Sequence, residues 1–529
     1  MKIIHKNTKT VIKSGFMTVT LLGMLVVFSI LMVAILSMIN LTSSSASKSL
    51  ESQKAFNIAE AGVNYYLWHL SHNPTDFKDG GTTPATPDPK LGYGPYTHNY
   101  IDDNAKKQGT FTIWVNPQGS GSTIATITSI GKTNSGKTTR TIEAKIGSPS
   151  FANYSVVSDT ALWFGSTESA NGPVHSNQGV RMDGASSTDV SSANTTYNPP
   201  VSLGGDGSSH PGVWCSSSII TPVNCNTRPK TDWLYPMPSV DFNKISGDLC
   251  TIKKEAFKVD PATSALASQA NACTQTPTTR TAAYLPQRST SGTYSISKGY
   301  LIELNNDNTY NLSQVNAETD TNSTYLTALT RVSVASNIAI PTSGIIFAED
   351  NVWVRSNSTF KGRLTIGAGR LATASTTHIT IADDIVYSQK NGSDALGLIT
   401  EGDVVLSPYA PPASGNFNFE VDAAVISQTG SVIYPLYYRS AGSTCTKGWT
   451  SANQTFTYYG AVASRQSWTW TWQLGGPCGN AVSYSGHYIT GILNNSTQYD
   501  YNLQYAPPPF FPITGSYNIL AWHEIITSP

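Results

Sequence analysis

The first 70 residues carry the clearest hydrophobic pattern in the chain. The run FMTVTLLGMLVVFSILMVAILSMINL covers residues 16–41, and no charged residue occurs between Lys13 and Lys48. A helix needs about 20 mostly apolar residues to cross a bilayer. Apolar residues then continue at i, i+3 and i+4 spacings as far as Leu70, which is typical of a helix with one buried face. The pattern predicts one helix over residues 16–70 that spans a membrane and continues beyond it.

After this helix the pattern changes to that of strands. Residues 71–108 are rich in Gly, Pro, Thr and Asp and predict a loop. Three runs that alternate apolar and polar residues follow at 109–115, 123–131 and 138–147. Gly-rich turns separate them, as in antiparallel strands. Residues 71–150 therefore predict a small three-stranded meander beside the helix.

From residue 151 to residue 529, short apolar runs recur between Gly, Asn, Ser and Asp turns. Two strand sets are predicted, each second strand following its partner after a short turn. Gaps of roughly 15–26 residues suit one irregular coil per rung of a parallel β-helix. A β-sandwich is the alternative, but it needs antiparallel hairpins with tighter turns. The strand centres expected in the first set are Ile346, Thr365, Ile381, Leu398 and Ala424, and those in the second are Trp353, Ile385, Val405 and Val432.

Two parts of this exterior region stand apart. Residues 190–330 predict an insertion or side lobe that carries four cysteines and a helix near 258–272. Residues 435–529 are aromatic and end in a Pro-fixed segment and a strand. We expect them to cover the last rung, because solenoids need terminal caps. The fold class expected for the whole chain is therefore mainly β, with a long N-terminal helix and a small α+β domain.

Charge predicts the orientation of the membrane helix. Four lysines precede the apolar run and none follows it directly, which puts the N-terminus inside and residues 71–529 outside the cytoplasm. A cleaved secretory signal is the alternative. Its apolar core would be about 7–15 residues and a small-residue site would follow it, whereas this run is longer and no A-x-A site follows it.

The N-terminus resembles a type IV prepilin leader. Residues 1–15 form a short basic segment that ends in Gly15, and Phe16 opens the apolar helix. The resemblance implies that a prepilin peptidase cuts after Gly15 and that Phe16 becomes the methylated first residue. Position five of the shortened chain is Thr20, where major pilins carry a glutamate. That departure argues against the bulk filament subunit, and a plain unprocessed anchor remains the alternative.

Further segments resemble PilX-type minor pilins. Residues 56–62 (FNIAEAG) match the helix element of that family at Ala59, Glu60, Ala61 and Gly62. In the exterior region, GPVHSNQGVRMDG, the passage from IADDIVYS to GSDALGLITEGDVVL, and PPPFFPITGSY carry the likeness. It implies a minor pilin in type IV pilus assembly or tip adhesion, with other pilin subunits bound through the N-terminal helix. A membrane-tethered β-helix enzyme acting on polysaccharide and a structural envelope protein are the alternatives.

Composition bears on which partners the chain binds and on the redox conditions under which its cysteines are found. Lys+Arg and Asp+Glu both number 33 and charged residues make up 12 % of the chain, so no nucleic-acid partner is expected. Six cysteines without CxxC spacing suggest three disulfides formed outside the cytoplasm, with buried free thiols as the alternative. Proximity in the sequence suggests the pairs Cys215–Cys225, Cys250–Cys273 and Cys445–Cys478.

Candidate chemistry is sparse. Acidic residues at the predicted coil edges could hold Ca²⁺ or work as acid and base, but Asp also simply forms turns. No HExxH, P-loop or G-x-S-x-G motif occurs, so we expect no enzyme and no cofactor. Trp468, Trp470 and Trp472 alternate and could stack on the sugar rings of a surface ligand, or could pack in the core. The acidic residues are Glu349, Asp350, Asp383, Asp384, Glu401, Asp403, Glu420 and Asp422.

Overall fold

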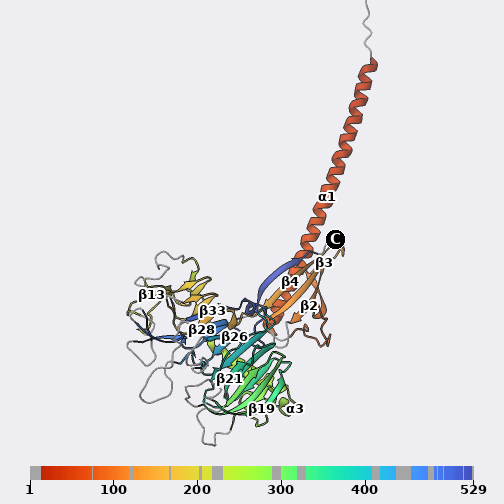
Figure 1. The fold of residues 1–529 in the computed structure, drawn as a ribbon. Coiled ribbons are helices and arrows are strands. Elements are labelled where there is room, and N and C mark those ends of the chain that lie inside the picture. The colour runs from red at the N-terminus through yellow and green to blue at the C-terminus, as the bar shows by residue number, and fades with distance from the viewer. Residues whose placement is uncertain are drawn as a thin grey trace, which may run out of the picture.

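The chain is mainly β, with one long N-terminal helix, a small antiparallel sheet and a large region of parallel sheets (Figure 1). This agrees with the fold class expected from the sequence. The computed structural model describes residues 14–73, 76–117, 124–165, 168–201, 205–216, 230–288, 299–318, 329–373, 375–407, 417–435, 454–474, 482–484, 487–492, 494–515 and 517–526.

Helix α1 (Ser14–His72) is continuous over 59 residues, a length of roughly 90 Å. Its N-terminal half projects away from the rest of the molecule (Figure 1), and the side chains of residues 16–50 are exposed. From Glu51 onward one face of the helix packs on a sheet. The predicted helix over 16–70 is thus confirmed, and its two halves have different surroundings.

The sheet beside α1 has five antiparallel strands in the order β1-β2-β3-β4-β34. The predicted three-stranded meander is β2, β3 and β4, and two strands lie outside it. The first falls in the predicted loop 71–108, and the second is the last strand of the chain. The bounds are β1 Tyr93–Ile101, β2 Lys107–Pro117, β3 Ile124–Thr133, β4 Thr139–Gly147 and β34 Asn518–Ile525.

The exterior region is a β-solenoid, because its long sheets are built almost wholly of parallel pairs. One sheet has eleven strands, in the order β15-β11-β8-β5-β28-β26-β24-β22-β20-β16 with β33 also beside β28. The strands are β15 Trp233–Leu234, β11 Val190–Ser192, β8 Val174–Ser176, β5 Val156–Ser158, β28 Gln454–Ser464, β26 Phe417–Ser427, β24 Ala395–Thr400, β22 Arg363–Ala368, β20 Ile345–Ala348, β16 Tyr284–Leu285 and β33 Asn494–Tyr499.

The facing side of the solenoid consists of two sheets. The longer has eight strands, β19-β18-β17-β21-β23-β25-β27-β29, and the shorter has three, β14-β9-β6. The strands are β19 Leu329–Ala339, β18 Thr309–Glu318, β17 Gly299–Leu304, β21 Asn351–Ser356, β23 Ile379–Ile381, β25 Val404–Leu406, β27 Val432–Ile433, β29 Trp468–Thr469, β14 Val213–Trp214, β9 Val180–Met182 and β6 Leu162–Phe164.

Short elements complete the coils and their connections. Among them, α2 is the longest helix after α1 in the described part of the chain. They are β7 Ser169–Ala170, β10 Ala185–Ser186, β12 Thr196–Tyr197, β13 His210–Pro211, β30 Thr471–Leu474, β31 Val482–Tyr484, β32 His487–Gly491, η1 Phe151–Asn153, η3 Phe242–Lys244, η4 Ala272–Thr274, η5 Tyr501–Gln504, α2 Ile245–Lys258 and α3 Pro261–Ser264.

The chain enters the solenoid in the middle. The first strand, β5, pairs with the late strand β28, with Val156 opposite Val462. The coils proceed from β5 through β8 and β11 to β15 at one end. A crossover that contains α2 then takes the chain to β16 at the other end, and the coils return from β20 to β28. The first and last coils are therefore neighbours.

This path corrects two expectations. Residues 190–330 are not a side lobe, since they supply β11, β14, β15, β16, β17 and β18 of the solenoid sheets as well as the crossover. The predicted helix near 258–272 is found earlier, as α2, followed by the single turn of α3. The segment KVDPATSALASQANA that suggested a helix has Pro261 at the first helical position of α3, and it therefore starts this short helix and not a long one.

Two predicted strand centres were assigned wrongly. Ile381 belongs to β23, which pairs with β21 and β25 in the eight-stranded sheet, not with the first set. Ile385 lies in neither set and makes one isolated bridge to Val421. The reason is unequal coil length: the turn between β22 and β23 covers residues 369–378, so even spacing misplaces the strands that follow it.

Both faces of the eleven-stranded sheet are buried. Its inner face contributes to the aliphatic core of the solenoid. Its outer face, including Ile345 and Phe347, is covered by α2 and by the segment 499–511 near the C-terminus. Backbone carbonyls of Ala506 and Pro507 accept hydrogen bonds from Arg363 of β22, the latter at 2.5 Å. The aromatic C-terminal region therefore lies along the sheet, and the expectation that it caps the last rung is wrong.

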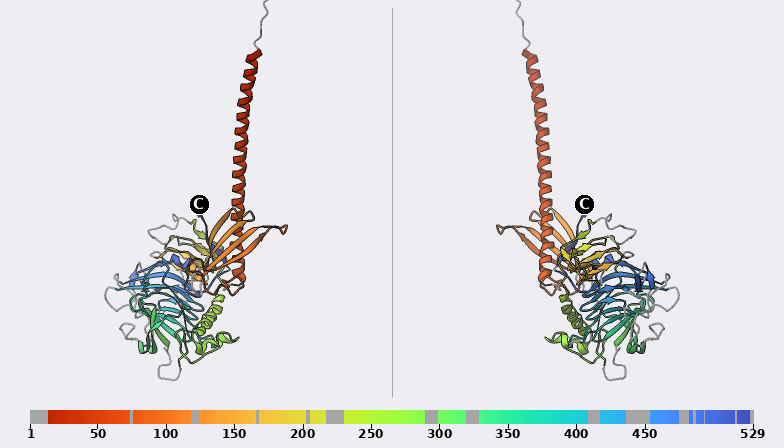
Figure 2. Two further views of the ribbon diagram at one scale, coloured as in Figure 1. Left: turned by 90° about the vertical axis from the view of Figure 1, so that its right-hand side faces the viewer. Right: turned by 90° about the vertical axis from the view of Figure 1, so that its left-hand side faces the viewer.

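Two stretches of chain cross side by side between the solenoid and the five-stranded sheet (Figure 2). One is the connector after β4 and the other is the segment before β34. The amide of Phe151 donates to the carbonyl of Pro512 at 3.1 Å, and the amide of Thr514 donates to that of Pro149 at 2.7 Å. The C-terminal strand then continues along β4, from Asn518 opposite Gly147. The connection between the two parts is thus double.

Candidate functional site

Residues 16–50 of α1, which project from the rest of the molecule, form the free half of this helix. The free half is the largest exposed apolar surface in the described part of the chain. Its large apolar side chains between Phe16 and Leu41 are 51–78 % exposed. The helix is long enough and apolar enough to cross a membrane. A helix that is hydrophobic all round requires lipid or other helices around it. This part of the structure is therefore compatible with membrane anchoring.

The expected processing point lies at the start of this helix. Gly15 is in its first turn, and the ring of Phe16 is 76 % exposed. Thr20 donates its hydroxyl hydrogen back to the carbonyl of Phe16 at 2.9 Å, and Met17 offers a second carbonyl at 3.0 Å. The hydroxyl therefore needs no partner outside the helix. Thr20 also carries no charge that would have to be neutralised in lipid.

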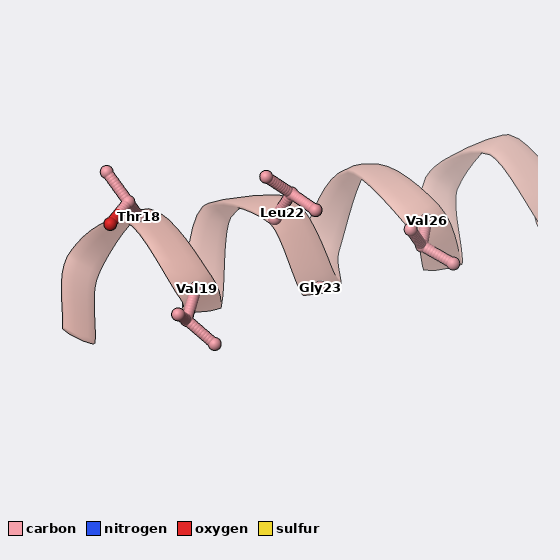
Figure 3. Close-up of a pocket in the computed structure, with 5 residues that line it drawn as sticks. All are labelled: Thr18, Val19, Leu22, Gly23 and Val26. Atoms are coloured by element: carbon pink, nitrogen blue, oxygen red, sulfur yellow. The ribbon is translucent and has the colours of Figure 1, made fainter. Parts of the chain in front are cut away.

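Gly23 creates a shallow groove on one face of the free half (Figure 3). Apart from its two chain neighbours and the backbone of its own helix, no atom lies within 4 Å of where its β-carbon would be. Thr18, Val19, Leu22 and Val26 line the groove. A small residue between larger apolar ones lets an acyl chain or a side chain of another helix approach the backbone closely.

The family-like element of α1 has a packing role on the other half of the helix. Ala59 is fully buried, and a β-carbon on Gly131 of β3 would lie 2.3 Å from its amide nitrogen. A β-carbon on Gly62 would lie 2.2 Å from the hydroxyl of Ser129. Glu60 is exposed and Ala61 is half-buried. The small residues thus bring the helix backbone onto the sheet, and sequence reasoning did not find their partner Gly131.

The acidic residues at the coil edges hold neighbouring coils together. Asp384 accepts a hydrogen bond from the amide of Glu420, and Asp422 accepts one from the amide of Tyr387, both at 2.8 Å. Asp403 does the same for Ser431 at 2.8 Å. Each carboxylate therefore satisfies a backbone amide of another segment of the solenoid.

Other members of this acidic set are engaged in the same way. Glu401 accepts from the amide of Arg370 at 2.7 Å, and Asp350 accepts from the amide of Arg288 at 3.1 Å. Within the described residues, no group of three or more His, Cys, Asp or Glu side chains could hold a metal ion. The carboxylates are positioned as structural acceptors.

Burial raises the pKa of Asp422 to about 6, and the nearby Glu420 carboxylate raises the pKa further. Lys390, whose side chain is 38 % exposed, lowers the pKa but does not offset the effect of burial. The folded state therefore binds more protons than the unfolded state between about pH 4 and pH 6. Stability from this group is lost as the pH rises through that window. We expect the free energy of unfolding to fall by on the order of 2 kcal/mol from this site between pH 4 and 7.

The measurement is urea unfolding at several pH values. Asp422→Asn keeps an acceptor for the Tyr387 amide and removes the titration, so its pH dependence should be flatter than that of the wild type. Asp403→Asn, at a turn where the carboxylate is 35 % exposed, is the control for the removal of one carboxylate that accepts a backbone amide. Equal slopes for the wild type and Asp422→Asn would contradict this expectation.

The three alternating tryptophans do not form a ligand surface. Trp470 is only 2 % exposed, and its ring lies 5.4 Å from that of Phe456 and 5.9 Å from that of Tyr458. Trp468 and Trp472 are half-buried. The proposed sugar-stacking ladder fails because the chain leaves the eight-stranded sheet between β29 and β30, so the three rings do not share one exposed strand face.

The cysteines in the described part of the chain, Cys215, Cys250 and Cys273, lie outside α1. Cys250 and Cys273 form a disulfide between α2 and η4, with their Cα atoms 5.1 Å apart. Cys215 is also disulfide-bonded. Cys225, Cys445 and Cys478 lie outside the described residues, so the pair Cys445–Cys478 stays a prediction.

No family model and no curated protein matches the chain. Among solved structures it is similar to the competence-associated pilin ComZ from Thermus thermophilus, with 12 % sequence identity and a TM-score of 0.26, over 90 % of this chain and 97 % of ComZ. A score at this level does not establish a shared fold.

Proposed function

We propose that the chain is a non-enzymatic minor pilin or pilin-like surface protein. Helix α1 anchors it in the cytoplasmic membrane with its N-terminus inside, and a prepilin peptidase removes residues 1–15. Other pilin subunits bind the free half of α1. The solenoid is the extracytoplasmic part and contacts a surface ligand.

One observation supports this proposal most directly: the two halves of a single helix have different surroundings. Residues 16–50 are exposed while residues such as Ala55, Ala59 and Tyr66 are fully buried against the sheet. A plain anchor needs only the span. Here the helix continues without a break into the core of a small domain, so any helix packed against the span is held in fixed orientation to the exterior.

Photo-crosslinking in the native host tests the binding of other subunits. A photoactivatable phenylalanine analogue replaces Leu22, which is 66 % exposed in the groove beside Gly23. We expect adducts with other chains that carry an N-terminal apolar helix and are encoded with a short basic leader before it. The matched control is the same replacement at Tyr501, which is 51 % exposed on the solenoid and should give no such adducts. Adducts of the Leu22 probe with lipid alone would leave the chain a simple anchor.

A further inference from the structure

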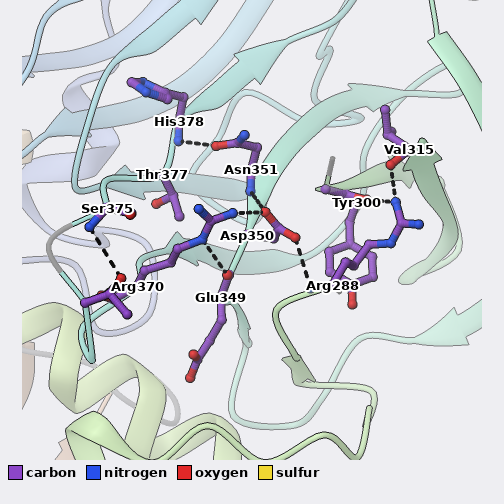
Figure 4. A network of polar contacts seen from close by, with 12 residues as sticks. Arg288, Tyr300, Val315, Glu349, Asp350, Asn351, Arg370, Ser375, Thr377 and His378 are labelled. Atoms are coloured by element: carbon purple, nitrogen blue, oxygen red, sulfur yellow. Dashed lines mark hydrogen bonds and ion pairs between the residues drawn. The ribbon is translucent and has the colours of Figure 1, made fainter. Parts of the chain in front are cut away.

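A lysine and a glutamate are buried in contact beneath α2. The side chain of Lys253 is 0 % exposed and that of Glu349 is 1 % exposed, and the Lys253 Nζ atom contacts Oε1 of Glu349. Lys253 comes from α2, and Glu349 directly follows β20. In Figure 4 the Glu349 side chain extends away from the polar network around Asp350 and toward the helical layer. The pair thus joins the outer helix to the sheet beneath it.

The surroundings of the pair are apolar and orient both groups. The rings of Phe257 and Phe347 each lie with their centres 5.8 Å from Nζ. The hydroxyl of Tyr284 donates to Oε1 of Glu349 at 2.8 Å, and Nζ donates to the carbonyl of Cys273 at 2.9 Å. The amine is therefore held by a backbone acceptor in addition to the carboxyl group, and the carboxyl group receives a hydrogen bond from Tyr284 that polarises it.

An ion pair in this position is costly. Two charges removed from water lose several kcal/mol of hydration each, and their attraction recovers this only in part. Burial lowers the pKa of Lys253, against the opposing effect of Glu349, and so favours the neutral, nucleophilic amine. Conversion of the pair into a neutral amide removes both charges from the interior.

Proximity favours the same conversion. The amine nitrogen touches an oxygen that is one bond from the carboxyl carbon, and both side chains are fixed by packing. Effective molarities for such oriented intramolecular reactions reach about 10⁵–10⁸ M. The Tyr284 hydroxyl is placed to stabilise the negative oxygen that forms when the nitrogen attacks that carbon.

We propose that Lys253 and Glu349 condense to an intramolecular amide bond. The nitrogen of Lys253 attacks Cδ of Glu349, the new C–N bond forms, and one C–O bond breaks. The leaving oxygen takes two hydrogens from the amine side and departs as water. An ammonium and a carboxylate together contain the amide plus one water, so no oxidant, reductant or other reactant is required.

The bond would lie where the crossover meets the returning coils of the solenoid. Helix α2 belongs to the crossover that connects the two ends of the solenoid, and the Cys250–Cys273 disulfide already closes part of that crossover. The amide links the crossover directly to β20, the first full strand of the returning coils. This inference rests on the fold of the solenoid and not on the proposed pilin role.

Mass spectrometry of the denatured, reduced full-length protein tests the proposal. We expect the intact mass to be lower than the sequence mass by one water, and digestion to release a branched peptide that joins the segments around residues 253 and 349. Lys253→Met and Glu349→Ala should restore the full mass. Lys254→Met, at the neighbouring and half-buried lysine, should keep the loss of water.

The wild-type measurement needs no variant to fold. Far-UV circular dichroism first establishes that the sample is folded. In such a sample, a full intact mass together with two unbranched peptides would overturn the proposal and leave Lys253 and Glu349 as an ion pair. Loss of water that persists in Lys253→Met would also overturn it, because the missing water would then come from another site.

Discussion

A chain that ends at Gly515 should lose its folded five-stranded domain while the solenoid remains folded. Strand β34 pairs with β4 from Asn518 opposite Gly147 to Ile525 opposite Thr141. Tyr517, just before it, is 7 % exposed in the core between α1 and the sheet. The truncation removes this ring and the whole ladder at once.

The expected loss is large for a domain of this size. Burial of one large side chain contributes about 1.5–3 kcal/mol, and each ladder hydrogen bond contributes about 0.5–1.5 kcal/mol. Glu524 also forms an ion pair with Arg140, with Nη2 to Oε2 at 2.5 Å. The total is on the order of 5 kcal/mol or more, comparable to the whole stability of many small domains.

Limited proteolysis followed by mass spectrometry measures this effect. The truncated chain should be cut within residues 51–147 at protease concentrations that leave the full chain intact. Trp522→Ser is the matched control, because that side chain is 58 % exposed and its replacement keeps the strand. Equal resistance of the truncated and full-length chains would show that β34 is dispensable.

Gly131→Val should separate α1 from the sheet. A β-carbon at this position would lie 2.1 Å from the carbonyl oxygen of Ala55 and 2.3 Å from the amide nitrogen of Ala59. Backbone atoms of a helix and a strand cannot move aside without breaking hydrogen bonds. We expect a loss of about 3 kcal/mol or more in the free energy of unfolding of this domain.

The control is Lys132→Val, because Lys132 is the next residue of the same strand and is exposed. It introduces the same β-branched side chain without a steric clash. Thermal unfolding in detergent should show a lower first transition for Gly131→Val and little change for Lys132→Val. Equal transitions for Gly131→Val and the wild type would contradict the close packing of helix and sheet.

The sequence predicts the elements whose patterns are local. The apolar run of α1 and the aliphatic strands from β20 to β27 are recognisable because each buries the same face over several residues. Strand β1 is missed because its sequence, YGPYTHNYI, holds a proline and aromatic residues in place of aliphatic ones. The pairing of β34 with β4 joins residues far apart in the chain, and no local pattern encodes it.

The residues of the candidate site also divide into those that a local sequence pattern places and those that only the tertiary structure places. Phe16 and Thr20 lie on the helix that the sequence predicts, and the helix begins at Ser14, so that it also includes Gly15. The fold, however, decides what each aromatic or acidic side chain contacts. Trp470 alternates with its neighbours in the sequence, but a change of sheet buries it. Lys253 carried no sequence signal at all, since only the crossover brings it beside Glu349.

The order of the coils also could not be predicted. Each coil of a solenoid contacts only its neighbours, so similar short strands fit several positions equally well. The first strand of the solenoid lies in the middle of the sheet because β5 pairs with β28, a strand that follows it by about 300 residues. Only the tertiary structure reveals which coil ends beside which.

The N-terminal residue of the mature protein tests the central claim most directly. Protein purified from a host with a prepilin peptidase should begin at methylated Phe16. Gly15→Leu should block the cut, whereas Gly23→Leu, where no atom outside its own helix lies within 4 Å of the new β-carbon, should leave it unchanged. Intact-mass analysis distinguishes the two outcomes: a chain that begins at Phe16 is the result this account predicts, and a wild-type chain that still begins at Met1 would contradict it.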